Sequence, residues 1–70
     1  MTAAEDREQE RSQLEHDLKT PLAVIIGYGE LVGSRDDERS RLEASRMIVE
    51  AAERLSGEVD ALLDRFLPRL

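Results

Sequence analysis

The chain has 70 residues, no cysteine and one histidine, and its 16 acidic against 10 basic residues leave a net charge of -6. Because a chain this short buries little apolar surface alone, we expect a second copy to complete its core. The acidic balance argues against nucleic acid as a partner, the single histidine argues against a multi-histidine metal site, and no apolar run approaches the roughly 20 residues that cross a bilayer.

The first predicted element is a helix over about residues 5–33, in a chain dominated by helix-forming residues. Residues 1–10 are almost wholly polar, and we expect them to form an exposed or frayed start. From Leu14 an apolar series follows at positions 14, 18, 21, 25, 28 and 32. Its steps of four and three residues are those of a heptad seam, which predicts that one side of this helix is buried.

A break in the pattern at about residues 33–37 predicts the connection between two helices. We expect Gly33 to end the first helix in a left-handed conformation, which costs glycine little. We expect Ser34 or Asp36 to cap the next helix, whose positive end suits the acidic residues at positions 36 to 38.

The second helix is predicted over about residues 37–67. Its apolar seam occupies positions 48, 52, 55, 59, 62 and 66, again with steps of four and three. Further apolar residues at positions 42, 49, 63 and 67 widen the stripe, and Pro68 ends the pattern. The large side chains expected in the core are Tyr28, Ile48, Leu55 and Phe66.

The predicted fold class is all-α, with residues 1–70 forming a single domain. It is a long helical hairpin that homodimerises into a four-helix bundle, because a second hairpin covers apolar stripes that a lone hairpin leaves in water. A long isolated two-stranded coiled coil is the alternative, and the break at residues 33–37 argues against it. Without cysteine or an apolar span we expect a cytoplasmic location and no direct membrane insertion, in a parent protein that can itself be membrane-anchored.

One segment of the first helix departs from the rules of a stable bundle. Pro21 lies inside the heptad pattern, where proline typically costs about 3 kcal/mol, and it should kink the helix one turn after His16. Gly27 and Gly29 follow, each costing up to about 1 kcal/mol relative to alanine in a helix interior. Such a concentration of unfavourable residues points to function.

Helical geometry places His16 on the outside of this helix. At about 100° per residue, its side chain lies roughly 200° from both Leu14 and Leu18 and therefore points to water. Thr20 lies one turn later and about 40° around, so its hydroxyl neighbours the imidazole. The same spacing allows Thr20 to bond back to the carbonyl of His16 instead. Small residues at positions 23 and 27 leave open surface on this side.

Seven consecutive residues around this histidine resemble the H-box of two-component sensor histidine kinases, whose pattern is His, Glu or Asp, Leu, Arg or Lys, Thr or Asn, Pro, Leu. All seven positions match, as His16, Asp17, Leu18, Lys19, Thr20, Pro21 and Leu22. The resemblance covers roughly residues 10 to 67 and identifies a dimerisation and histidine-phosphotransfer (HisKA-type) domain. Glu15 departs from the family, which often has a small polar residue before the histidine, and the usual upstream aromatic residue is absent.

The resemblance implies a role for each polar residue of the motif. His16 is the phosphoacceptor, and Asp17 matches the acidic residue that acts as hydrogen-bond acceptor or general base. Thr20 matches the position thought to orient a hydrolytic water in a phosphatase reaction. Lys19 is a weaker candidate that could stabilise phosphoryl charge, because its side chain can also simply be solvated.

The resemblance also implies the partners. A histidine protein kinase of this type takes the phosphoryl group from ATP and Mg²⁺ held by a separate catalytic domain, in cis or in trans, and passes it to an aspartate on the receiver domain of a response regulator. The chain itself has no Gly-rich phosphate loop, so we expect it to bind no cofactor or metal and to supply only the phosphotransfer part. A stand-alone phosphorelay intermediate and a purely structural dimeric bundle remain as alternatives.

Overall fold

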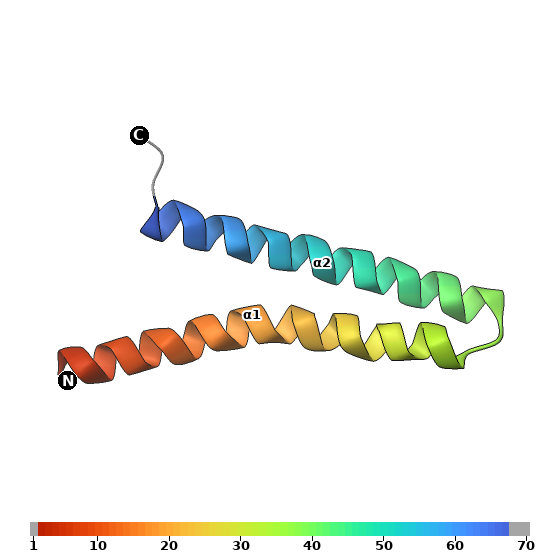
Figure 1. The fold of residues 1–70 in the computed structure, drawn as a ribbon, viewed down its shortest axis with the longest axis horizontal. Coiled ribbons are helices and arrows are strands. Elements are labelled where there is room, and N and C mark those ends of the chain that lie inside the picture. Colours follow the sequence, from red (N-terminus) through yellow and green to blue (C-terminus); the bar gives the residue numbers. More distant parts are fainter. Residues whose placement is uncertain (1, 68–70) are drawn as a thin grey trace.

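The computed structural model describes residues 2–67, which form two helices, α1 (Ala3–Ser34) and α2 (Glu38–Phe66). Figure 1 shows them antiparallel and side by side, with both chain termini at the same end. The predicted helical hairpin is confirmed. The chain folds back on itself and does not form the one continuous helix that a long isolated two-stranded coiled coil would require. The prediction that Pro68 ends the second helix falls outside the described residues.

The start of α1 is exposed, as the sequence predicted, but it is capped rather than frayed. The Thr2 hydroxyl accepts a hydrogen bond from the Glu5 backbone N–H at 3.2 Å, and the Glu5 carboxylate accepts one from the Thr2 backbone N–H at 3.2 Å. This reciprocal pair satisfies two backbone donors that an uncapped helix leaves unpaired. Helix α1 therefore begins at Ala3, ahead of its apolar seam.

The predicted seam of α1 faces α2. Its six positions are buried or half-buried, and Pro21 is the largest side chain that is fully buried. The helix is continuous through Pro21, and Figure 1 shows it bowed rather than broken. The buried residues of α2 are both small, Ala44 and Ala51, and Ala51 lines a groove together with Pro21. A small residue of α2 therefore lies beside the buried proline ring.

The connection corrects two predictions. Gly33 lies inside α1, and no glycine among the described residues has a positive φ; Ser34 ends the helix, with Arg35 in an extended conformation. The cap of α2 is Asp37, not Ser34 or Asp36, because the Asp37 carboxylate reaches the Ser40 backbone N–H at 2.9 Å. Hydrogen bonds from the Ser40 hydroxyl and backbone N–H lower the pKa of Asp37 below its ordinary value.

The apolar stripe of α2 divides into two faces. The inner face packs on α1 and comprises Ala44, Ile48, Ala51, Leu55 and Leu62. The outer face is exposed in the hairpin and comprises Leu42, Val49, Val59, Leu63 and Leu67, whose exposed fractions run from 41% to 71%. The predicted seam thus crosses from one face to the other.

The sequence placed Phe66 in the core, but the hairpin leaves it 57% exposed at its open end, where it lines a hollow with Leu14 and four charged residues of α1. The guanidinium of Arg65 lies 5.2 Å from the centre of its ring, and Arg65 also forms an ion pair with Glu10 of α1. The open end of the hairpin is therefore joined by a charged pair instead of an aromatic core. Neither helix, as far as the structure describes them, is long and apolar enough to span a membrane.

Candidate functional site

His16 projects from the middle of α1 on the side away from the inner seam. Its side chain is 73% exposed, as helical geometry predicted. It lines an open hollow of about 430 Å³ with neighbours on α1, which we call the His16 flank: Ser12, Glu15, His16, Lys19, Thr20 and Ala23. Ala23 keeps one side of the imidazole uncovered, so a reactant can reach the ring from solvent.

Asp17 lies beside the imidazole with its carboxylate toward one ring nitrogen. Its Oδ1 is 3.6 Å from Nδ1 of His16, which is slightly beyond hydrogen-bond distance. The Asp17 side chain is about one-third exposed, because it lies nearer the α2 side of the helix. None of the described residues forms a hydrogen bond with Nε2 of His16. The two ring nitrogens are therefore distinct: Nδ1 faces a carboxylate and Nε2 faces solvent.

Asp17 and Lys19, two polar neighbours of His16, each contact a side chain one turn earlier on α1. The sequence did not assign a role to either of these contacting residues, Gln13 and Glu15. Gln13 donates from its side-chain amide to Oδ1 of Asp17 at 2.9 Å. Glu15 accepts a hydrogen bond from Nζ of Lys19 at 2.7 Å and forms an ion pair with it. Both pairs have i, i+4 spacing, and that spacing was the signal in the sequence that could have found them.

The Glu15–Lys19 pair has an electrostatic consequence. The hydrogen bond from Lys19, and next the positive charge of its ammonium group, lower the pKa of the Glu15 carboxyl below its ordinary value. Glu15 is the residue that departs from the family pattern, and here it directs Lys19 along the helix. The Lys19 ammonium is therefore engaged by Glu15 rather than directed at the imidazole.

The Thr20 hydroxyl bonds to the backbone of α1, which is one of the two arrangements that its spacing from His16 allows. Its Oγ1 donates to the backbone carbonyl of His16 at 2.8 Å, which fixes the hydroxyl one turn below the histidine. The oxygen still has lone pairs that can accept a hydrogen bond from water. Thr20 also lines a second hollow, a groove of about 260 Å³ between the helices, whose other walls are Pro21, Val24, Met47, Glu50, Ala51 and Arg54.

Residues 2–67 contain no cluster of three or more acidic, histidine or cysteine side chains that could hold a metal ion. The carboxylates near the histidine are instead engaged singly, Asp17 with Gln13 and Glu15 with Lys19. The site therefore consists of one nucleophile and individually held neighbours.

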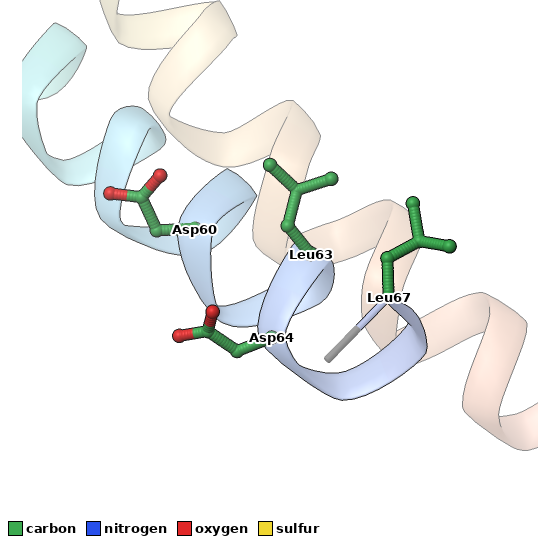
Figure 2. A pocket seen from close by; sticks show the side chains of 4 residues that line it. All are labelled: Asp60, Leu63, Asp64 and Leu67. Carbon is green, nitrogen blue, oxygen red and sulfur yellow. The ribbon is translucent and has the colours of Figure 1, made fainter. Parts of the chain in front are cut away.

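The outer face of α2 offers a different kind of surface. Figure 2 shows its last turns, where Leu63 and Leu67 point one way and Asp60 and Asp64 point the other. These four side chains line a hollow of about 600 Å³. An apolar stripe bordered by charge is typical of a protein interface and carries no nucleophile.

The comparisons with known proteins concern the chain as a whole. A family model described as "His Kinase A (phospho-acceptor) domain" matches residues 6–67, nearly the whole chain. Searches of curated proteins and of solved structures gave no match.

Proposed function

Because this chain belongs to the His Kinase A (phospho-acceptor) domain family, we propose that it is the phosphoacceptor and dimerisation domain of a two-component sensor histidine kinase. Its part in that protein kinase is phosphotransfer, with ATP and Mg²⁺ held by a separate catalytic domain in cis or in trans. The observation that carries the proposal is the exposure of His16, whose side chain is 73% accessible in the middle of a helix. ATP as the donor places the reaction in the cytoplasm.

The first step is attack by the imidazole on ATP. The lone pair of Nε2 forms a bond to the γ-phosphorus, and the bond from that phosphorus to the β,γ-bridging oxygen breaks as ADP leaves with the electron pair. The positive charge that develops on the ring is stabilised at Nδ1, where Asp17 accepts a hydrogen bond or the proton. The 3.6 Å separation of Nδ1 and Oδ1 supports this role, since a small side-chain movement closes it.

The second step passes the phosphoryl group to a response regulator. A carboxylate oxygen of the receiver aspartate attacks phosphorus, and the nitrogen–phosphorus bond breaks with its electrons returning to Nε2. The groove that begins at Thr20 supports docking of the receiver, because Thr20 lines both this groove and the hollow of His16. Its floor is apolar, with Val24, Met47 and Ala51, and its rim is charged, a composition that suits a protein partner.

In a phosphatase reaction, Thr20 would accept a hydrogen bond from the water that hydrolyses the receiver's phosphoaspartate. Its hydroxyl proton is already donated to the His16 carbonyl, so the oxygen is oriented with its lone pairs free for water. Lys19 has a smaller part in this proposal, because Glu15 neutralises its charge.

Dimerisation is typical of this family, and the outer face of α2 supports it here. Five apolar side chains, each more than two-fifths exposed, are unfavourable in water and become buried when a second hairpin packs on them. We propose that the homodimer is a four-helix bundle whose interface contains this outer face. His16 lies on a different side and remains accessible in that arrangement.

The test is phosphorylation of the chain by a matching ATP-binding domain with labelled ATP and Mg²⁺. We expect an acid-labile, base-stable label on the wild type and none on His16→Ala, with Ser34→Ala as a matched control that keeps the label. If no competent kinase domain labels the wild type, the phosphoacceptor role is excluded and the purely structural bundle remains. Label acquired from a phosphorylated regulator, and not from ATP, would instead indicate a stand-alone phosphorelay intermediate.

A further inference from the structure

We infer that Gln13 is a positioning residue of the phosphotransfer site, whose side-chain amide holds the Asp17 carboxylate next to Nδ1 of His16. The inference rests on the proposed function, because it concerns the hydrogen-bond acceptor of that reaction. Gln13 lies outside the seven-residue motif, and nothing in the family match assigns it a role. Its contact with Asp17 is one of the shorter side-chain hydrogen bonds of the hairpin, at 2.9 Å.

The two contacts of Asp17 meet on one atom. Oδ1 accepts the hydrogen bond from Gln13 at 2.9 Å and lies 3.6 Å from Nδ1 of His16. A carboxylate oxygen has two lone pairs, so one oxygen can accept from both donors at once. Because the amide of Gln13 directs this oxygen toward the imidazole, a movement of under about 1 Å completes the second hydrogen bond.

The position of Gln13 on α1 makes it suited to this task. It stands three residues before His16 and four before Asp17, so both side chains are its neighbours on the next turn. Gln13 and His16 also line the same hollow of about 560 Å³, together with Glu8, Gln9 and Ser12. The amide therefore lies on the approach to the imidazole and contacts its acceptor, but does not contact the ring.

The chemistry of an amide also matters. It donates a hydrogen bond, so it can orient the Asp17 carboxylate. A carboxylate at position 13 could not donate and would repel Asp17, whereas an alanine would leave the Asp17 side chain free to rotate. An arginine would keep a donor within reach of the same oxygen. These three replacements distinguish positioning of the Asp17 carboxylate by a hydrogen-bond donor from a general requirement for a large side chain at position 13.

The experiment reads the imidazole directly, because the chain contains a single histidine and its ring nitrogens give one unambiguous set of NMR signals. With the wild-type chain at pH 8, we expect the ¹⁵N spectrum to show the Nδ1–H tautomer enriched over that of a free imidazole. Gln13→Ala and Gln13→Glu should lose the enrichment, Gln13→Arg should retain it, and Glu53→Ala, at an exposed position of α2, should leave it unchanged. Far-UV circular dichroism verifies that each variant remains helical.

The same variants are then phosphorylated with the ATP-binding domain. We expect kcat to fall about fivefold in Gln13→Ala and further in Gln13→Glu, with KM for ATP unchanged, and to return to within about twofold of wild type in Gln13→Arg. An unchanged tautomer ratio in Gln13→Ala would overturn the inference, whatever the kinetics. A changed ratio with an unchanged kcat would also overturn it. Failure of the proposed function is distinct, since it would appear as an unlabelled wild type whose NMR spectrum still responds to Gln13.

Discussion

The His16 flank of α1 and the outer face of α2 are both exposed, yet they differ in every other respect. The flank is polar, and its side chains are tied to neighbours one turn away, Lys19 to Glu15 and Thr20 to the His16 backbone. The outer face is a row of aliphatic side chains without such ties. The exposed surface of this small hairpin therefore contains a polar region that is stable in water and an apolar region that is not.

The difference follows from how long a partner stays bound at each surface. On the proposed function, a nucleophile that meets a donor domain and then a receiver has to stay in water between encounters, and polar surroundings make that stable. An apolar face in water is unfavourable in proportion to its area, so it favours a partner that remains bound. We expect the two surfaces to respond independently to mutation, and the following predictions test that separation from the largest effect to the smallest.

The outer face of α2 should control assembly. Leu63→Asp places a charge among the apolar side chains of the proposed dimer interface, and we expect it to raise the dissociation constant of the dimer by about 10²- to 10³-fold. Sedimentation velocity at micromolar concentration measures this as a shift from dimer to monomer. Ala61→Asp adds the same charge in the same turn at an exposed position outside that face, and should leave the dimer intact. A Leu63→Asp chain that remains dimeric would show that the interface lies elsewhere.

The His16 flank should control chemistry without affecting assembly. Asp17→Asn keeps the shape of the side chain but removes its charge and basicity, so we expect the rate of phosphorylation by the ATP-binding domain to fall about 10²-fold while the dimer is unchanged. Asp6→Asn, in the exposed first turn of α1, is the matched control. A rate within twofold of wild type would remove Asp17 from the reaction and leave it a surface charge.

The smallest effect concerns the Glu15–Lys19 pair. Because Lys19 lowers the pKa of Glu15, the carboxylate stays ionised and paired as pH falls through the ordinary range for glutamate. Any stabilisation from the pair is thus present above that range and lost as pH falls through the lowered pKa. In a ¹³C NMR titration, Lys19→Met should move the Glu15 midpoint up toward the ordinary value, and Lys19→Arg should not. An identical midpoint in Lys19→Met would show that the two side chains do not pair in solution.

The sequence anticipated the placement of His16 because helical periodicity is a local property. A residue 200° from both of its seam neighbours must face away from them in any regular helix, whatever the helix packs against. The same reasoning gave the inner seam of α1 correctly from Leu14 to Val32. Gln13 was missed although its spacing from Asp17 was visible, because many i, i+4 pairs exist in this chain and the sequence does not show which of them form.

The connection could not be predicted in detail, since caps depend on the backbone angles of single residues. Ser34, Asp36 and Asp37 are all suitable capping residues, and the structure selects Asp37 because α2 begins at Glu38. Gly33 offered a left-handed end that α1 does not use, since the chain leaves the helix through an extended Arg35.

By itself the sequence determined two helices, the exposure of the histidine and the motif that surrounds it, because each depends on residues within a few turns of one another. Only the tertiary structure decided which half of the wide apolar stripe of α2 meets α1. Both halves are apolar at heptad spacing, so periodicity alone did not distinguish them. Ala44 and Ala51 are small enough to lie buried between the helices, and Ala51 lies beside the buried ring of Pro21. Val49 and Val59 are left on the outer face although they are no larger than the Ile48 and Leu55 that pack on α1, so burial depends on position in the fold and not on size.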